Sequence, residues 1–467
     1  MSVTKEDRAF REYALTAHPL RVLLMVCGPL AIYQALQQIF RILDTLMAAH
    51  VGSDAVSAVA VLSQITLMIT AIGTGLSVGG CIKISEAYGQ GDYELVQRRT
   101  STLYALVVIV SLVVMAVLIP FASPFLRLLN TPEELIAAGT GYFRIEILSL
   151  IASFFNSVYI AVERSRGHSR RIMALNMVVI VVKLALSALF VYVLEGDVVS
   201  IALATLLSQA VLLAYAVARM LRDEGAFRFS FSRVSLRGKT LLPILNLSYP
   251  VTAEKMLFAG GKVVVNSMSG TYGPLTAGAL GVSNNIGGLT TNWFAGMLDG
   301  ASTVISQNRG AGEHRRAVRL FYWLLLIDAV IGVIGLAAVY AALPWLAEVF
   351  ASSKNQFDEG FRAMIVDIHR WEMLGYITLG VNSAVNALML GCGYAKRTML
   401  LNLMRVFVFR IPVLWFFQNY TSLGTEAVGL TMMISNVAVG VASVLMVIPV
   451  LRSLYRRAAE KPETNET

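Results

Sequence analysis

Residues 102–122 read TLYALVVIVSLVVMAVLIPFA, a stretch that contains no charged side chain. About 20 apolar residues are enough for a helix to cross the hydrocarbon core of a bilayer. Because lipid offers no water to backbone groups, a spanning segment is either a helix or part of a closed barrel. The run is continuous rather than alternating, which excludes a barrel strand. The stretch therefore predicts one membrane-spanning helix.

Similar apolar stretches recur along the whole chain of 467 residues, of which 56% are hydrophobic and only 14% are charged. A soluble chain carries about 25% charged residues, so most of this surface is expected to face membrane lipids. We predict an all-α membrane protein with twelve transmembrane helices. The predicted spans are 23–48, 55–82, 102–122, 142–163, 172–194, 198–219, 241–268, 275–305, 317–343, 364–390, 398–418 and 426–450.

The net charge of +9 has a one-sided distribution. With twelve spans, 26 of the Lys and Arg residues fall on the side that holds both termini, and 3 fall in the opposite loops. Cytoplasmic loops of membrane proteins carry this excess of basic residues. We therefore predict a multi-pass protein of the cell inner (plasma) membrane with both termini in the cytoplasm. The basic charge then needs no nucleic-acid partner to explain it.

The two halves of the sequence repeat each other. A shift of 221 positions pairs many glycine, proline and polar residues, among them Pro29/Pro250, Gly75/Gly296, Gly79/Gly300, Gly91/Gly312 and Arg98/Arg319. A shift of 226 pairs the middle of each half, including Arg144/Arg370, Glu146/Glu372, Asn156/Asn382 and Gly167/Gly393. The glycine pairs form small-xxx-small patterns, which predict close helix packing.

Six spans in each half make the repeat parallel, with a pseudo-two-fold axis along the membrane normal. We predict two six-helix bundles with a central cavity that opens alternately to the two sides. The predicted parts are an N-terminal lobe 1–219, a cytoplasmic linker 220–240, a C-terminal lobe 241–451 and a cytoplasmic tail 452–467. The linker is basic and partly amphipathic, which is typical of a segment that lies on a membrane surface.

Four stretches of the sequence resemble the multidrug and toxic compound extrusion (MATE) family, prokaryotic branch. They are Pro29 with Leu43-Asp44-Thr45-Leu46-Met47, Gly52 and Ala58; Ser306-Gln307-Asn308-Arg309-Gly310-Ala311-Gly312; Gly391-Cys392-Gly393 with Arg410-Ile411-Pro412; and Ala202-Leu203-Ala204-Thr205. The resemblance implies a pair of six-helix bundles. It also implies export of organic molecules, typically amphiphilic cations, in exchange for protons or sodium.

The resemblance further implies an ion-coupling site in the N-terminal half. Asp44 and Thr205 match this site, but its two positions in the fifth span read Lys183 and Ser187. A lysine ammonium would compete with sodium for the same negative charge, so we expect coupling to protons rather than to sodium. Lys183 is interpreted as a tethered cation beside Asp44; the alternative is a lysine that extends to the membrane interface.

A polar stripe follows the first predicted span. Gln34, Gln37, Arg41 and Asp44 are three or four residues apart and so share one helical face. Ionisable residues within a membrane are functional by default, which favours a cavity lining with Asp44 as the protonatable centre. The alternative is a structural Arg41–Asp44 pair one turn apart.

A second polar lining is predicted in spans seven and eight. Its members are Glu254, Lys262, Asn266 and Asp299. Lys255 lies on the face of Lys262 and Asn266, whereas Asn285 and Asn292 share a face with Asp299 and are interpreted as interhelical hydrogen-bonding groups. Arg144 with Glu146, and Arg370 with Glu372, occupy equivalent places in the two halves, and each of these residues is expected to pair with another helix in a structural role. His369 gives only weak evidence of a function because no partner is visible in the sequence.

No catalytic set and no metal cluster are visible, so we predict neither an enzyme nor a cofactor. Gly238-Lys239-Thr240 ends like a phosphate-binding loop, but Arg233 replaces the first glycine of that motif and no strand precedes it, which excludes ATP binding. We predict a monomeric, proton-coupled exporter of small organic molecules. The alternatives are a flippase or exporter of an anionic or lipid-linked metabolite and, from another class, a membrane receptor.

Overall fold

A computed structural model describes residues 4–48, 53–121, 123–124, 133–196, 198–352 and 359–460, and in these ranges the regular structure is helical. The side chains of 42–48, 53–65, 133–139, 198, 274 and 352 lie outside the description. The helices of the first half are α1 (Lys5–Thr16), α2 (Pro19–Ala48), α3 (Ser53–Gln90), α4 (Tyr93–Leu118), α6 (Glu133–Ser165), α7 (Ser169–Ala188), η1 (Leu189–Val193) and α8 (Val198–Arg222). The linker contains η2 (Phe231–Arg233).

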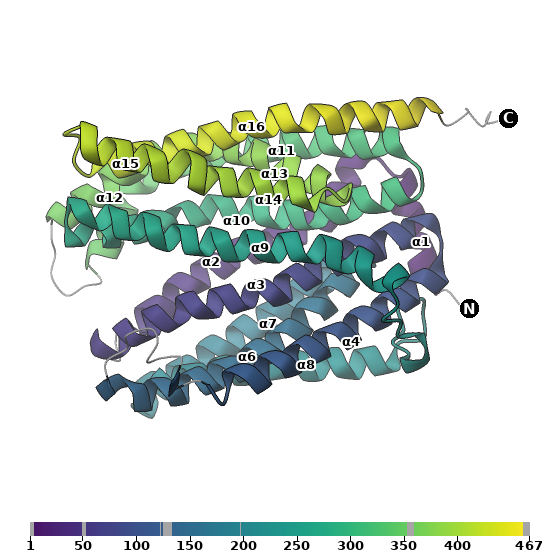
Figure 1. Ribbon diagram of the computed structural model, residues 1–467, viewed down its shortest axis with the longest axis horizontal. Coiled ribbons are helices and arrows are strands. Elements are labelled where there is room, and N and C mark those ends of the chain that lie inside the picture. Colours follow the sequence, from purple (N-terminus) through teal and green to yellow (C-terminus); the bar gives the residue numbers. More distant parts are fainter. Residues whose placement is uncertain are drawn as a thin grey trace. The chain divides into compact units, whose positions relative to one another are not determined.

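The second half continues in the same way. Its helices are α9 (Gly238–Ser269), η3 (Gly270–Tyr272), α10 (Pro274–Gly310), α11 (His314–Ser352), α12 (Glu359–Glu372), η4 (Met373–Gly375), α13 (Tyr376–Gly391), α14 (Ala395–Leu403), η5 (Met404–Arg410), α15 (Ile411–Tyr420) and α16 (Glu426–Glu460). Figure 1 shows their arrangement along the chain.

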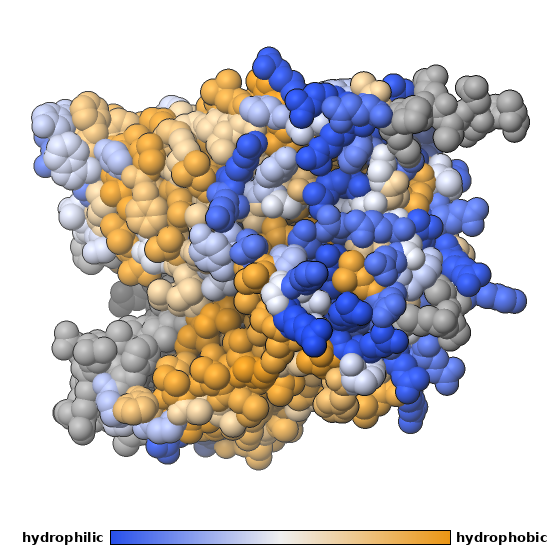
Figure 2. All heavy atoms as spheres, turned by 45° about the vertical axis from the view of Figure 1, so that its right-hand side comes forward, coloured by the Kyte–Doolittle hydropathy of each residue, from blue (hydrophilic) through white to orange (hydrophobic). Residues whose placement is uncertain are grey.

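Among the described residues, ten helical segments are long and apolar enough to cross a membrane. The helices α9 and α10, with 32 and 37 residues, are not among the ten, although the repeat predicts both as spans. Large apolar side chains on α4, such as Leu112, Val113 and Val117, are more than half exposed, as expected for a helix that faces lipid. Figure 2 shows how widely hydrophobic residues cover one face of the molecule.

The chain divides into two compact units. Unit 1 comprises residues 1–11 and 39–256, and unit 2 comprises 12–38 and 257–467. The boundaries fall inside α1, α2 and α9, so each of these helices contributes one part to each unit. The helices α2 and α9 contain a proline of the repeat, Pro29 and Pro250, which removes a helical hydrogen bond and favours a bend.

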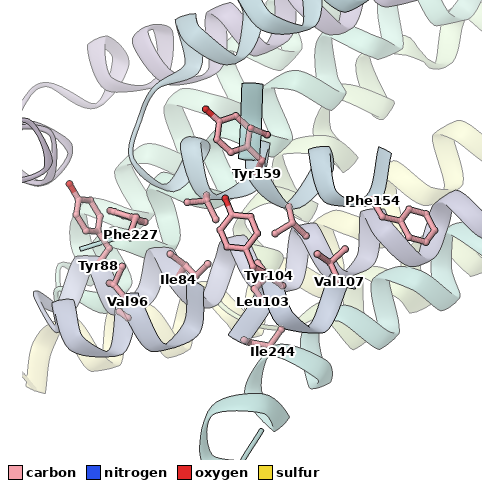
Figure 3. Close-up of a cluster of buried hydrophobic side chains, with 14 of the residues drawn as sticks. Ile84, Tyr88, Val96, Leu103, Tyr104, Val107, Phe154, Tyr159, Phe227 and Ile244 are labelled. Carbon is pink, nitrogen blue, oxygen red and sulfur yellow. The ribbon is translucent and has the colours of Figure 1, made fainter. Parts of the chain in front are cut away.

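Unit 1 is centred on an aromatic core between α3, α4 and α6. Tyr88, Tyr104, Phe154, Tyr159 and Phe227 are all buried in it. Figure 3 shows these rings together with aliphatic side chains of the same helices. Phe227 comes from the linker, so the linker after α8 is packed into the core of this unit rather than lying free.

The core of unit 2 is more aliphatic. Ile286 of α10, Leu343 of α11, Ile365 and Ile368 of α12 and Met432 of α16 belong to one buried cluster. This cluster fixes α10, α12 and α16 against each other, and these three helices carry the polar residues described below.

The backbone confirms the sequence repeat at its turns. Gly91 and Gly312, which a shift of 221 pairs, have φ values of 79° and 80°. Gly167 and Gly393, which a shift of 226 pairs, have φ values of 79° and 87°. Left-handed backbone of this kind favours glycine, because other residues clash with the neighbouring carbonyl oxygen. Both halves therefore end corresponding helices with the same turn.

The predicted close packing at the small-xxx-small patterns is also confirmed. A Cβ atom on Gly79 of α3 would lie 2.7 Å from the backbone nitrogen of Ser248 of α9, within unit 1. A Cβ atom on Gly300 of α10 would lie 2.9 Å from the Cα atom of Cys27 of α2, within unit 2. In unit 1 the glycines of α3 thus allow close contact with α9, and in unit 2 the glycines of α10 allow close contact with α2.

The first part of α1, residues 5–11, belongs to unit 1 and is held there by buried charges. Arg166, in the turn after α6, contacts the carboxylates of Asp7, Glu163 and Asp223, with an Nε–Oδ1 distance of 3.6 Å to Asp7. Burial opposes the charged form of Arg166, but the hydrogen bond and negative charge of Asp223 raise its pKa above the usual value. The guanidinium therefore stays charged and keeps the N-terminal helix in place.

Candidate functional site

The predicted N-terminal site is only partly within the described side chains. Asp44 lies on α2, but its side chain falls outside the description. Thr205 of α8 is half-buried, and its hydroxyl donates to the carbonyl oxygen of Ile201 at 3.2 Å. Lys183 of α7 is also half-buried. Whether these three residues form one site remains a prediction.

The remaining residues of the predicted polar stripes divide between the two units. Gln34 and Gln37 are half-buried on the part of α2 that belongs to unit 2, whereas Arg41 and Glu254 belong to unit 1. Lys262 of unit 2 is exposed, with its Nζ atom 5.3 Å from the ring centroid of Phe258.

Asn266 and Asp299 of unit 2 are half-buried. The backbone carbonyl oxygen of Asp299 accepts hydrogen bonds from the hydroxyls of Ser302 and Thr303 on the same helix. The structure therefore locates these two residues on their helices without bringing them into one pocket.

The asparagines of α10 have the interhelical role that we predicted. The side-chain amide of Gln38 on α2 donates to the backbone carbonyl oxygen of Asn285 at 3.0 Å. Asn292 in turn donates to Oε1 of Gln38 at 3.0 Å. One buried glutamine thus joins α2 to α10 through two residues seven positions apart on a single helical face.

Unit 2 also contains a chain of buried hydrogen-bonding side chains that was not predicted from the sequence. Its members are Ser283 of α10, His369 and Glu372 of α12, and Tyr376 of α13. The Ser283 hydroxyl lies 2.6 Å from Oε2 of Glu372 and 2.8 Å from Nδ1 of His369. The other ring nitrogen of His369 lies 2.9 Å from the Tyr376 hydroxyl. His369 is fully buried and Glu372 is 7% exposed.

The local backbone explains why these residues meet. The short η4 turn separates α12 from α13 and ends at Gly375. A Cβ atom on Gly375 would lie 2.6 Å from the Cβ atom of Asn436, so glycine allows α16 to approach at this point. Gly287 of α10 faces the same residues, but a Cβ atom there would make only ordinary contacts, 3.7 Å from the His369 ring and the Tyr376 hydroxyl.

Two arginines flank this chain on the π-helix η5. Arg405 donates twice to Oδ1 of Asn436, at 3.1 and 2.8 Å. Arg410, which is 2% exposed, donates to the same oxygen at 3.2 Å and to the Ser435 hydroxyl at 3.1 Å. Pro412 follows within two residues, and π-helical turns of this kind are frequent at functional sites.

A second buried carboxyl group lies on α11. Asp328 has no exposed surface, and among the described residues neither of its carboxylate oxygens has a hydrogen-bond partner. The Ser383 hydroxyl instead donates to the carbonyl oxygen of Phe294 at 3.1 Å. Burying a polar group without a hydrogen-bond partner is costly, so Asp328 is an unfavourable residue at this position of α11.

Few sequence signals point to this site. The sequence shows no partner for His369, because Ser283 lies 86 positions earlier in the chain. The structural pairing predicted for Arg370 is confirmed by its contact with Glu426 of α16. Glu372, however, pairs with Ser283 in the buried chain. The available signal was the combination of a histidine, a glutamate and a tyrosine at 369, 372 and 376, which places all three on one helical face.

The helical fold and the ten membrane-length segments of the described residues are typical of a polytopic membrane protein. The sequence matches the MatE family over residues 29–189 and 250–416, and the chain belongs to that family. The two matched segments correspond to the two halves of the repeat.

Curated relatives support the same assignment. The "Probable multidrug resistance protein YpnP" of Bacillus subtilis is 24% identical over 412 residues, which cover 88% of this chain and 91% of the relative. The "Probable multidrug resistance protein NorM" of Thermotoga maritima is 21% identical over 405 residues and 83% of each chain.

Solved structures show the same fold. The outward-facing structure of a multidrug resistance MATE family transporter of the MOP superfamily superposes with a TM-score of 0.91 at 19% identity, covering 98% of this chain and 100% of the other. A MOP superfamily transporter from Pyrococcus furiosus, described as having a binding pocket of reverse polarity, superposes with a TM-score of 0.90 at 19% identity, covering 97% and 100%.

Proposed function

We propose that this protein is a secondary-active antiporter that exports small organic, drug-like molecules by alternating access in exchange for protons. The family and the multidrug names of its relatives support export of organic molecules. The observation that carries proton coupling is the buried chain Tyr376–His369–Ser283–Glu372 in unit 2. Buried ionisable residues within the membrane mark proton relays and substrate pathways.

The chain has the hydrogen-bond order that a relay requires. When the Ser283 hydroxyl donates to Glu372, its oxygen accepts Nδ1–H of His369, and Nε2 of His369 accepts from Tyr376. Protonation of Glu372 reverses the direction of donation along the same atoms. A carboxyl group that is protonated in one conformation and ionised in the other links proton uptake to the movement of the protein.

The direct test is transport in proteoliposomes with a proton gradient and a sodium gradient imposed separately. We expect uphill movement of a fluorescent organic ion with the proton gradient alone. Glu372→Gln keeps the shape of the side chain and removes its proton site, so it should reduce proton-driven transport by at least about a hundredfold, the lower end of the range for loss of a general acid–base group.

Glu146→Gln is the matched control, because the repeat places Glu146 at the position of Glu372. This variant should retain proton-driven transport. Equal losses in both variants, or transport that follows only the sodium gradient, would contradict proton coupling through the C-terminal half. Circular dichroism and size-exclusion profiles of the purified variants separate a lost proton site from a lost fold.

We retain Asp44, with Thr205 and Lys183, as a second proton-coupling site in the N-terminal half, and Gln34, Gln37, Arg41, Glu254, Lys262, Asn266 and Asp299 as the lining of the substrate cavity. Asp44→Asn should then abolish uphill transport. If Asp44 is only a counter-ion to Lys183, the double variant Asp44→Asn with Lys183→Met should recover full pH-driven transport, because no unpaired charge remains.

We further propose twelve spans, with α9 and α10 added to the ten apolar helices, in an inner-membrane monomer with both termini in the cytoplasm. The proposed lobes are 1–219 and 241–451, joined by the linker 220–240. The 26-to-3 distribution of basic residues supports this orientation. A reporter that is active only outside the cytoplasm, fused after Thr467, should give no signal.

A second candidate function is export or flipping of an anionic or lipid-linked metabolite. Lys262 and Arg405 both lie over the Phe258 ring, at 5.3 and 5.6 Å, and Arg410 is buried nearby on η5. Such a basic, aromatic surface suits a phosphate or carboxylate. The reversed pocket polarity described for the Pyrococcus furiosus relative makes this alternative worth testing. Export of an anionic dye, with no export of a cationic dye of similar size, would favour it.

A further inference from the structure

The Gly238-Lys239-Thr240 motif has no role in the proposed transport, although it resembles the end of a phosphate-binding loop. In the structure it forms the first turn of α9. The amide groups of Thr240 and Leu241 donate to the carbonyl oxygen of Arg237, at 3.0 Å each. The amides of Gly238 and Lys239 have no acceptor among the described residues. Free amide groups at the start of a helix favour a bound anion.

These amides border a pocket of about 950 Å³ within unit 1. The pocket is lined by residues 232–240 of the linker and α9 and by Arg98 of α4. Its four basic side chains are Arg98, Arg233, Arg237 and Lys239. Basic side chains converging on helix amides provide the chemistry that binds a phosphate group.

The positive charge of the pocket is only partly balanced. Oε1 of Glu94 on α4 contacts both Arg98, at 3.1 Å, and Arg233, at 2.5 Å. Within the described part of the chain, Arg237 and Lys239 have no ion pair. One carboxylate therefore faces four cations, and the two cations next to the free amides are the ones left uncompensated.

The pocket is also held in place by hydrogen bonds. The amide of Ser230 donates to the Ser101 hydroxyl at 3.0 Å, and the amide of Ser235 donates to the Thr102 hydroxyl at 3.1 Å. Both hydroxyls belong to α4, next to Arg98. Because the linker is fixed on both sides of Arg233, little ordering is needed when a ligand binds.

Exposed apolar side chains surround the basic ones. Phe231 is 84% exposed, and Leu236 and Leu242 are 54% and 55% exposed. The linker joins the end of α8 to the start of α9, at the right of Figure 1. Figure 2 brings that side forward and shows hydrophilic residues bordering a hydrophobic surface there. Apolar groups beside a cationic pocket suit a molecule with both an acyl region and a phosphate.

We propose that this pocket binds the phosphate headgroup of an anionic phospholipid in the leaflet next to the linker. Arg237, Lys239 and the first amides of α9 contact the phosphate, while Phe231 and Leu236 enter the acyl region beside it. A soluble phosphate compound would use the same charges but would gain nothing from the exposed apolar side chains.

Native mass spectrometry of the full-length protein in detergent tests this proposal, with phosphatidylglycerol and phosphatidylcholine as the added lipids. Phosphatidylglycerol should bind more tightly than phosphatidylcholine. The double variant Arg237→Gln with Lys239→Gln should weaken phosphatidylglycerol binding about tenfold or more, from the attraction of two basic residues for an anionic lipid. Inorganic phosphate at millimolar concentration should not displace the lipid.

The matched control is Arg222→Gln with Arg228→Gln, which removes the same charge from the same region but lies outside the pocket lining. It should change binding by less than about threefold. Equal weakening in both double variants would show general attraction to charge and overturn the proposal. Equal binding of the two lipids by the parent protein would also overturn it, and displacement by inorganic phosphate would assign the pocket to a soluble ligand instead.

Discussion

The two halves of the chain share one backbone plan but carry different chemistry at equivalent positions. A shift of 226 pairs His369 with Phe143 and Arg410 with Leu184. Phe143 is fully buried in a cluster with Tyr142, Ile147 and Ala202, where His369 has a serine and a tyrosine as partners. A shift of 221 likewise pairs Asp328 with Val107, and both side chains are fully buried.

This difference separates what the fold requires from what the function requires. The glycines at the turns are identical in both halves, because the left-handed backbone requires them. His369, Arg410 and Asp328 are not repeated, although Glu372 is matched by Glu146, so the fold itself does not need these three ionisable groups. Their presence in unit 2 is then best explained by a task that only this half performs, and replacing each by the residue of the other half tests that explanation.

The largest loss of stability is expected for Arg410→Leu, which introduces the residue of the equivalent position in the first half, Leu184. The change removes the two hydrogen bonds that the buried guanidinium donates to Ser435 and Asn436. Hydrogen bonds to charged groups contribute about 1.5–3 kcal/mol each, so losing two should cost more than losing neutral ones. Thermal unfolding of the purified protein in detergent should show a clearly lower midpoint, or little folded protein should be recovered.

Arg370→Leu is the control for that variant, because Arg370 is 43% exposed and pairs with Glu426 at the surface. Exposed pairs contribute at most about 1 kcal/mol, so its midpoint should change little. Similar losses for both arginines would mean that burial does not distinguish the two sites.

A smaller loss of stability is expected for His369→Phe, which gives α12 the residue that α6 has at the equivalent position, Phe143. The phenylalanine ring fills a similar volume, but the Tyr376 hydroxyl and the Ser283 hydroxyl each lose their hydrogen bond to the imidazole. Leaving buried polar groups unsatisfied costs about 1–3 kcal/mol. If the chain conducts protons, the transport rate should also become less dependent on pH, while Phe143→His should leave that dependence unchanged. An unaltered pH profile in His369→Phe would remove the histidine from the proposed relay.

The smallest effect, and one of opposite sign, is expected for Asp328→Val. Replacing a buried carboxyl group that lacks partners by the apolar residue of position 107 should stabilise the protein by about 1–2 kcal/mol. The thermal midpoint should rise in Asp328→Val, and the midpoint of Asp328→Asn should lie between those of the parent protein and Asp328→Val. Loss of transport in the stabilised variant would indicate that the carboxyl group is retained for function, whereas a strongly lowered midpoint would show that Asp328 has a structural partner.

Much of the fold was predictable because its signals are local or periodic. The hydropathy of stretches such as 102–122 identifies most spans, and the repeat identifies α9 and α10, which hydropathy alone does not. The packing of Gly79 and Gly300 followed from spacing, since small residues four apart form one face of a helix.

The site was less predictable because its contacts join distant parts of the chain. Ser283 and Glu372 are 89 positions apart, and no local pattern links a serine on one helix to a glutamate on another. The bend of η5 that brings Arg405 and Arg410 to a single oxygen atom also depends on tertiary packing. Asp44, which the resemblance emphasised, lies where the side chains are not described, so its role stays a prediction.

The division of α2 between the two units has a consequence for biosynthesis. Residues 12–38 belong to a unit whose other members begin at Leu257. At about 5–20 residues per second, the ribosome needs roughly 10–45 s to produce the intervening chain. During that interval Gln38 has no α10 to accept its hydrogen bond, and the early helix must be shielded by lipid, by the insertion machinery or by temporary neighbours. The first transmembrane helix to be made is therefore one of the last to reach its final packing.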